Sequence, residues 1–222
     1  VGFYTKASET FVTDVKVLDA PTKQPLKTAQ SRAEGPASIL KTQIDEISRT
    51  ISRGIGLPIL KIEKTQPKVI ELTTNSLEAY NLFLRGRDET ERFLFADARK
   101  SLEEAARLDP TFAVAYLYLS MAANELSDFK ARDEAMEKAK LYAAKASEKE
   151  RLFIESRYAG WIEQDPDKRL RILKELTEKY PREKYAHIDL GRAYDAHRLY
   201  PESLSEYEKA LALDPNYGPV LN

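Results

Sequence analysis

The spacing of hydrophobic residues changes near residue 75 and divides the chain into two regions. Before that point, residues 10–18 alternate between apolar and polar side chains, which predicts a half-buried strand. Turn-forming residues follow, and a second, weaker strand is predicted over residues 26–34. Residues 38–53 place isoleucine and leucine side chains on one face, which predicts a helix that Gly54 is suited to end. A hairpin with one helix is too small for a stable domain alone, so we expect either that further strands precede residue 1 or that the hairpin packs against the region that follows.

After residue 75 the hydrophobic period is helical throughout. Ser147 and Glu150 have the spacing of a capping box, and Asp165 before Pro166 is typical of a capped helix start. The pattern predicts eight helices joined by short connections, over residues 76–91, 95–108, 112–126, 130–146, 148–163, 166–180, 183–197 and 201–213.

An internal repeat runs through these helices. Two sets of four residues share the spacing 12, 7 and 5: Gly86, Ala98, Ala105 and Pro110, and then Gly191, Ser203, Ala210 and Pro215. A glycine inside a helix costs about 1 kcal/mol relative to alanine, which is tolerable where a neighbouring helix approaches closely. The small residues of each set fall on the second helix of a pair, and the proline ends that helix.

These residues resemble the tetratricopeptide repeat, a 34-residue helix-turn-helix unit that stacks into a superhelix. The resemblance predicts a mainly α fold, with four units over residues 79–112, 113–149, 150–183 and 184–217 preceded by a small β-hairpin plus helix. The second unit has Ser120 in place of the glycine and about three extra residues, and the third has Arg157 and Arg169 at the small-residue places. Residues 216–221 resemble the opening of a fifth unit, so we expect the chain to be a fragment.

A second resemblance covers residues 1–60. The strand pattern at 12–19, the turn after it and the helix through Asp45 and Glu46 are similar to one half of TolB-like amino-terminal domains. That resemblance implies a bacterial protein and an incomplete α/β domain over residues 1–74. It is compatible with a cytoplasmic or a periplasmic location, and the sequence does not choose between them.

The tetratricopeptide resemblance also implies a binding groove lined by the first helix of each unit. Carried over by position, the expected partner-binding residues are Tyr80, Phe83, Arg87, Met121, Asn124, Arg151, Tyr158, Trp161, Tyr185, Arg192 and Asp195. Val114, Leu117, Ile154 and Ile188 occupy further groove positions, and burial in the core is the alternative for the last three. Phe83 and Leu117 stand where a basic clamp for a terminal carboxylate would have Lys or Asn, which disfavours a chain end as the ligand.

Chemistry beyond binding has little support. The chain has no cysteine, and His187 and His197 are ten residues apart, so neither a metal signature nor a catalytic motif is present. We therefore expect no catalytic, cofactor or metal site. The 35 basic and 36 acidic residues disfavour nucleic acid as a partner, and no apolar run is long enough to span a membrane.

The sequence favours a non-enzymatic scaffold that binds another protein, as a peptide segment or a helix, in the groove of the array. Self-association, or occupation of the groove by the protein's own segment, is an alternative. A second hypothesis is a regulatory, sensing or dimerisation arm of a larger bacterial signalling protein, whose kinase, cyclase or DNA-binding module lies outside this chain.

Overall fold

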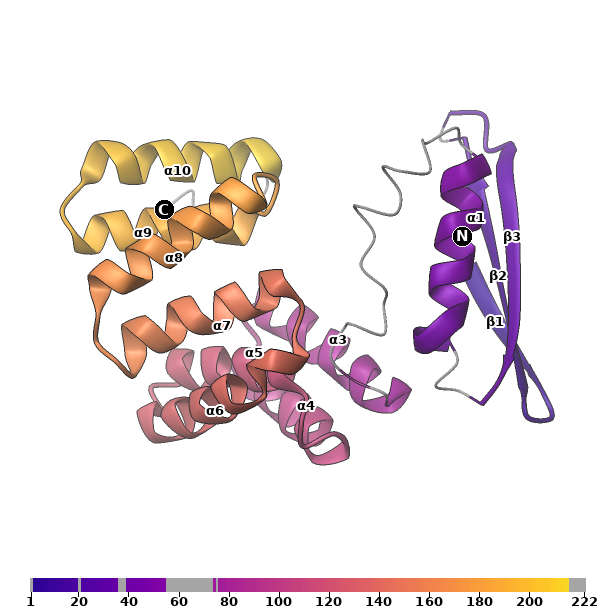
Figure 1. Ribbon diagram of the computed structural model, residues 1–222, viewed down its shortest axis with the longest axis horizontal. Coiled ribbons are helices and arrows are strands. Elements are labelled where there is room, and N and C mark those ends of the chain that lie inside the picture. Colours follow the sequence, from indigo (N-terminus) through magenta and orange to yellow (C-terminus); the bar gives the residue numbers. More distant parts are fainter. Residues whose placement is uncertain (1, 20, 36–38, 55–73, 75, 216–222) are drawn as a thin grey trace.

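The computed structural model describes residues 2–19, 21–35, 39–54, 74 and 76–215 of the 222-residue chain. The expected opening of a fifth unit, over residues 216–221, lies outside these residues. In the amino-terminal region, three strands form an antiparallel sheet in the order β1, β2, β3, and a π-helical turn η1 leads into helix α1 (Figure 1). The bounds are β1 Gly2–Ala7, β2 Thr10–Leu18, β3 Pro25–Glu34, η1 Ile39–Gln43 and α1 Ile44–Gly54.

The sheet confirms the two predicted strands and adds a third, β1, at the start of the chain. Phe11 of β2 and Ile47 of α1 are buried, and the buried Gln43 side chain donates a hydrogen bond of 3.0 Å to the carbonyl oxygen of Phe11. The Thr13 hydroxyl in turn donates a hydrogen bond of 2.5 Å to the side-chain amide oxygen of Gln43. The amide of Gln43 therefore ties the helical segment to β2 at a place where the sequence pattern suggested only apolar contact.

The second region is helical, as the spacing predicts. Its α-helices are α3 Leu77–Glu91, α4 Phe95–Leu108, α5 Ala113–Glu125, α6 Phe129–Tyr142, α7 Glu148–Trp161, α8 Pro166–Lys179, α9 Lys184–Ala196 and α10 Tyr200–Leu213. Each predicted boundary lies close to an observed one, except that the helix expected over residues 130–146 ends at Tyr142 and continues as the 3₁₀ turn η3, Ala143–Lys145. The capping box of Ser147 and Glu150 is present.

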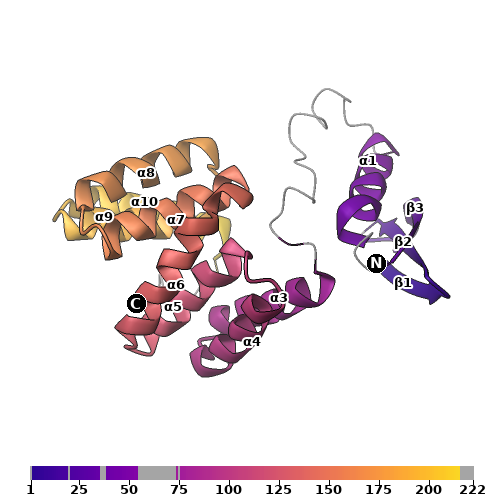
Figure 2. The same cartoon turned by 60° about the horizontal axis from the view of Figure 1, so that its bottom comes forward.

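Successive helices form antiparallel pairs, α3 with α4, α5 with α6, α7 with α8, and α9 with α10 (Figures 1 and 2). Each pair turns through a residue in the left-handed conformation, namely Phe93, Ser127, Gln164 and Arg198, with φ between 53° and 61°. These residues are 34, 37 and 34 positions apart. The repeat is therefore visible in the backbone, and the second interval contains the three extra residues.

The repeated spacing of the glycines has a direct structural counterpart within the helix pairs. A Cβ on Gly86 would lie 2.6 Å from Leu102 Cγ, and a Cβ on Gly191 would lie 2.5 Å from a ring carbon of Tyr207. In the second pair, Ser120 takes the glycine's place and its hydroxyl lies 3.7 Å from the sulfur of Met136. A small residue on the first helix thus receives a large one from the second helix in each of these three pairs.

The three-residue turn η3 separates two halves of the array. Figures 1 and 2 show α3 to α6 in one half and α7 to α10 beside it in the other. The junction between them contains Trp161, whose ring is covered by the guanidinium groups of Arg132 and Arg157, each 5.4 Å from the ring centre. None of the described helices is long and apolar enough to cross a lipid bilayer.

Candidate functional site

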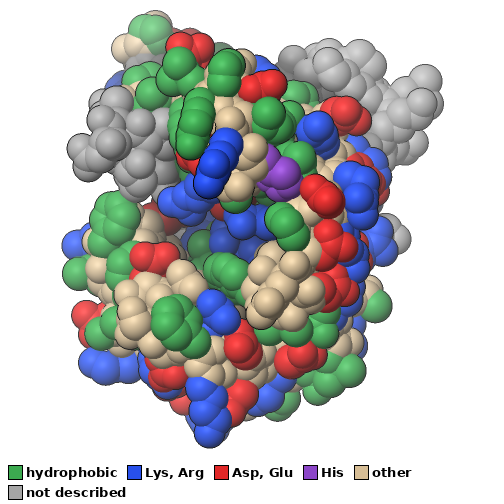
Figure 3. All heavy atoms as spheres, turned by 90° about the vertical axis from the view of Figure 1, so that its left-hand side faces the viewer, with side chains coloured by type: hydrophobic (Ala, Val, Ile, Leu, Met, Phe, Trp, Pro, Cys, Tyr) green, Lys and Arg blue, Asp and Glu red, His purple; other side chains and the backbone are tan. Residues whose placement is uncertain are grey.

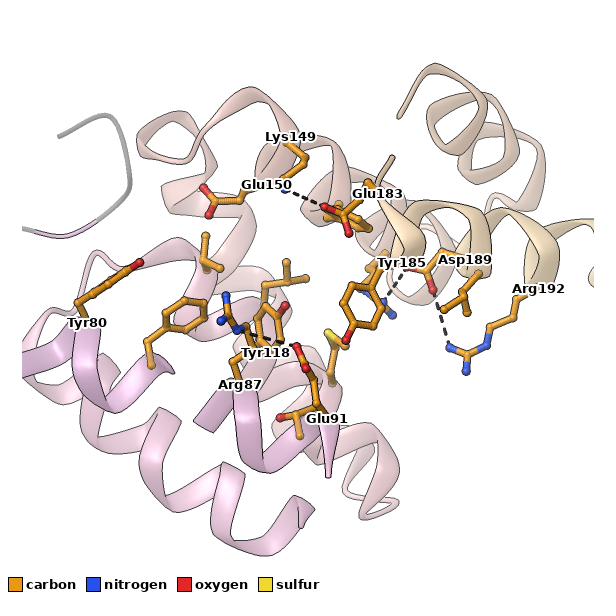
Figure 4. Close-up of a pocket in the computed structure, with 18 residues that line it drawn as sticks. Tyr80, Arg87, Glu91, Tyr118, Lys149, Glu150, Glu183, Tyr185, Asp189 and Arg192 are labelled. Carbon is orange, nitrogen blue, oxygen red and sulfur yellow. Dashed lines mark hydrogen bonds and ion pairs between the residues drawn. The ribbon is translucent and has the colours of Figure 1, made fainter. Parts of the chain in front are cut away.

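The first helices of all four pairs line one cavity of about 370 Å³ (Figure 4). Its apolar lining comes from α3, α5, α7 and α9, in the order Tyr80, Phe83, Val114, Leu117, Tyr118, Met121, Phe153, Tyr185 and Ile188. Seen from the left-hand side of Figure 1, the surface of the molecule is hollowed, with Lys or Arg side chains in the depth of the hollow and hydrophobic ones beside them (Figure 3).

Aromatic rings form the wall where α3 meets α5. The Phe83 ring lies edge-on to Tyr118 with ring centres 5.4 Å apart, and it also contacts Phe112 at 5.2 Å. Phe83 is only 6% exposed, so it serves the core as well as the cavity. Burial raises the pKa of Tyr118 to about 12, so its hydroxyl is neutral at physiological pH with a wider margin than that of an ordinary tyrosine. This wall therefore offers apolar area and a neutral hydroxyl.

Most charged groups of the cavity are balanced by a neighbour. Arg87 lies 3.9 Å from Glu91, and Lys149 Nζ lies 2.8 Å from Glu183 (Figure 4). Glu150 accepts hydrogen bonds from the backbone N–H and the hydroxyl of Ser147 as part of the α7 cap. These carboxylates are therefore engaged within the protein.

A third charge cluster, between α7 and α9, contains more arginine than carboxylate. Arg157 Nη2 lies 2.8 Å from Asp189, and Arg192 Nη1 lies 3.8 Å from the other oxygen of the same carboxylate. The side chains of Arg157 and Asp189 are 11% and 4% exposed. Behind them, Arg169 of α8 packs against Gly160. Asp189 is thus the carboxylate that faces all three arginines.

Two nitrogens of this cluster lack a hydrogen-bond acceptor, since the buried Nε atoms of Arg157 and Arg169 have no partner within the described part of the chain. Burial lowers the pKa of the Arg169 guanidinium; Asp189 counteracts this shift, and the like charges of Arg157 and Arg192 add to it. Buried charges of one sign with a single counter-ion are unfavourable. The cluster is therefore short of negative charge.

The structure brings together six of the eleven residues expected in the groove: Tyr80, Phe83, Arg87, Met121, Tyr185 and Arg192 line the cavity. Val114, Leu117 and Ile188 line it as well. The other five lie elsewhere, and they are Asn124, Arg151, Tyr158, Trp161 and Asp195.

Three of the residues expected in the groove, Arg151, Tyr158 and Trp161, belong to α7 and do not line this cavity. Trp161 lies at the junction described above, and the Tyr158 hydroxyl lies 3.2 Å from Glu137 of α6. Ile154 is fully buried in a core cluster, as the alternative interpretation allowed. The helix instead presents Lys149, Glu150, Phe153 and Arg157 to the cavity.

Two further residues expected in the groove, at the ends of α5 and α9, contact neighbouring side chains instead of the cavity. Asn124 lies beside Glu125 and Arg132 at the end of α5. Asp195 accepts a hydrogen bond of 2.8 Å from the Tyr207 hydroxyl, so it is engaged within its own helix pair. One signal in the sequence pointed to the α7 contribution: an arginine, Arg157, at the place of a glycine has to direct its side chain away from the helix contact.

Both histidine side chains lie within hydrogen-bond distance of residues in other segments of the array. His187 places Nδ1 2.6 Å from Glu206 and Nε2 3.1 Å from the carbonyl oxygen of Pro181. His197 places Nδ1 2.8 Å from the carbonyl oxygen of Ala193, and its Nε2 is 3.1 Å from Asp167. Among the residues that the structure describes, no three histidine or acidic side chains are grouped as a metal ion would require.

The fold that these helix pairs define is a tetratricopeptide-type helix-turn-helix array, preceded by a small sheet and a helix. No family model and no curated protein matches the chain. The chain is similar to several solved structures. PilW, described as a widely conserved type IV pilus biogenesis factor, matches with a TM-score of 0.49 and 14% identity, over 65% of this chain and 66% of PilW.

Two further solved structures show the same kind of likeness. YrrB, described as a TPR protein with an unusual peptide-binding site, matches with a TM-score of 0.38 and 17% identity over 72% of this chain and 76% of its own. MamA from Desulfovibrio magneticus RS-1 matches with a TM-score of 0.40 and 19% identity over 63% and 77%. The assignment of the fold rests on the repeat and on the helix geometry. The TolB-like resemblance of residues 1–60 stays a prediction.

Proposed function

We propose that this protein is a non-enzymatic scaffold that binds a peptide segment or helix of another protein in the cavity lined by α3, α5, α7 and α9. The observation that supports this proposal is the convergence of four separate first helices on one cavity with an aromatic and apolar lining. Tyrosine and arginine combine a large contact area with polar groups and are common anchors of protein interfaces, and phenylalanine adds apolar area.

The size and depth of the cavity favour a segment over a globular surface. At about 370 Å³ it is near the lower end of pockets that enclose small ligands, about 300–1,000 Å³. A concave space of this size accepts a few side chains of an extended or helical segment. Tyr80 and Tyr185 stand on α3 and α9, at opposite sides of it (Figure 4), so a bound segment would lie between them.

The test begins with selection of binders from a random peptide library, followed by affinity measurements on the selected peptides by fluorescence anisotropy. Tyr80→Ala and Tyr185→Ala are expected to weaken binding by more than about tenfold, the effect of removing an interface hot spot. Tyr200→Ala is the matched control, because Tyr200 is 62% exposed at the start of α10 and does not line the cavity. Equal affinities for all three variants, or no selected binder at all, would count against the proposal.

The second hypothesis, a regulatory arm of a larger bacterial signalling protein, stays a prediction because it concerns modules outside this chain. A scaffold of the kind proposed here could also serve in such an arm. The binding experiment therefore bears on the groove in both cases.

A further inference from the structure

The three charge clusters of the cavity differ in how well each is neutralised. The pair of Arg87 and Glu91 and the pair of Lys149 and Glu183 each contain one charge of either sign. Between α7 and α9, by contrast, Arg157, Arg169 and Arg192 surround the single carboxylate of Asp189. The lining as a whole carries four basic and four acidic side chains, so the positive excess is local to the α7–α9 side, where Arg169 adds its charge behind the lining.

We propose that this place is a subsite for one carboxylate of the bound segment, held by Arg192 and Arg157 at the α7–α9 side of the cavity. The inference rests on the proposed function and specifies its partner as a segment with an acidic residue. The occupant argued for is therefore an acidic peptide, and charge complementarity is the reason.

The two arginines have different roles at such a subsite. Arg157 is largely buried and already held by Asp189 through Nη2, so its position is fixed before a ligand arrives. Arg192 is 55% exposed and lies 3.8 Å from Asp189, too far for a hydrogen bond. Its guanidinium is therefore free to donate to an incoming carboxylate, with the two parallel N–H groups that suit a planar anion.

Arg169 supplies charge without contact. It does not line the cavity, but it packs against Gly160, its charge interacts with those of Arg157 and Asp189, and its buried Nε has no acceptor within the described residues. Each arginine in excess raises the potential at the subsite, and the surrounding apolar side chains reduce screening by water. A second carboxylate would relieve the repulsion among the three guanidinium groups.

The residues beside the subsite define the neighbours of the acidic residue. Phe153 and Ile188 line the cavity next to Arg157 and Asp189, and Met121 lines it from α5. An acidic side chain flanked by apolar or aromatic ones would therefore match both the charge of the subsite and the apolar lining beside it.

The probe is a set of short peptides with acetylated and amidated ends, in which the central residue is Glu, Gln or Lys and the flanking residues are mixtures of Leu, Phe, Tyr and Ser. Binding to the full chain is measured by fluorescence anisotropy. The Glu peptides are expected to bind about tenfold or more tightly than the matching Gln peptides, since a hydrogen bond to a charged group strengthens binding by about this factor. The Lys peptides are expected to bind most weakly.

Variants assign the effect to the subsite. Arg192→Gln is expected to remove most of the preference for Glu over Gln peptides, with Arg157 keeping the remainder, and to leave the affinity of the Gln peptides unchanged, while Arg192→Lys retains more of the preference. Arg171→Gln is the matched control, since Arg171 is an exposed arginine of α8 that does not line the cavity. It removes the same net charge and is expected to keep the full preference.

Equal binding of Glu and Gln peptides, or an equal loss for Arg192→Gln and Arg171→Gln, would overturn the subsite and leave the proposed groove intact. Failure of every peptide to bind the wild-type chain would overturn the proposed function together with it. A further arm uses the Gln peptides with a free carboxyl end. If these bind as well as the Glu peptides with blocked ends, the carboxylate comes from a chain end and the assignment to a side chain is wrong.

Discussion

The contact between the two helices of a pair is made in two chemically different ways in this array. In the pairs α3/α4 and α9/α10, a glycine on the first helix receives Leu102 or Tyr207 from the second. In the pair α7/α8, Arg157 stands at the place of that glycine, and Arg169 stands at the place of the facing small residue. The backbone repeat is the same in both cases, so the pattern tolerates a large change of side chain at these two positions.

The difference shows what the third pair needs in return. Its own glycine, Gly160, lies three residues beyond the expected place and makes room for the Arg169 side chain. Arg157 turns away from the helix contact and reaches Asp189 on the next pair. In the glycine pairs the contact at this position is therefore closed within the pair, whereas Arg157 of the third pair depends on a carboxylate from the neighbouring pair and directs its charge toward the cavity.

The largest effect is expected for Asp189→Asn, which removes the carboxylate from among the three arginines. Loss of one partner from a buried ion pair costs about 3–5 kcal/mol in unfolding free energy, because the remaining charge is left uncompensated. Chemical denaturation of wild-type and variant chains measures the change. Asp88→Asn is the control, because Asp88 is 66% exposed in a surface ion pair with Arg92, and it is expected to change stability by about 0.5 kcal/mol or less. A comparable loss for both would show that the α7–α9 cluster is not special.

An intermediate effect is expected from adding one methyl group at each glycine. Gly86→Ala and Gly191→Ala would place Cβ 2.6 Å and 2.5 Å from Leu102 and Tyr207, and overpacking of this kind costs about 1–3 kcal/mol. Gly160→Ala meets only the flexible Arg169 side chain, at 2.9 Å. It is expected to be neutral or to stabilise the chain by up to about 1 kcal/mol through helix propensity. Thermal unfolding of the three variants tests this order, and a destabilising Gly160→Ala would remove the distinction between the pairs.

The smallest effect concerns the contact between the third and fourth pairs through His197. The hydrogen bonds to the Ala193 carbonyl oxygen and to Asp167 raise the pKa of His197 above its ordinary value of 6.5. Its contribution to stability is therefore fully present below about pH 6.5 and is lost as the pH rises through the raised folded-state pKa.

The measurement compares wild type with His197→Gln by urea unfolding at several pH values. The difference in stability is expected to be about 0.5 kcal/mol or less, largest at mildly acidic pH and absent at alkaline pH. Because His187 is present in both chains, its own titration cancels in the difference. A difference that grows with rising pH would contradict the assigned contacts.

The sequence determined the local structure closely. The helical period, the caps at Ser147 and Asp165 and the strand alternation at residues 10–18 are local signals, and the structure places helices and strands at nearly the same residues. The repeat spacing also predicted at which glycines a neighbouring helix approaches closely, since that contact lies within one helix pair. The third strand, β1, was missed as an element because its first residues begin the chain and its pairing with β2 is a contact between segments.

Only the tertiary structure decided which face of α7 lines the cavity. In the first unit, Tyr80, Arg87 and Thr90 line the cavity. The equivalent repeat positions in the third unit are Arg151, Tyr158 and Trp161, and these α7 residues do not line it. The turn η3 intervenes between the halves of the array, and stacking of pairs depends on long-range packing that a repeat register does not contain. The register assigns equivalent positions along the chain, whereas the angle between two packed halves determines which of those positions meet in space.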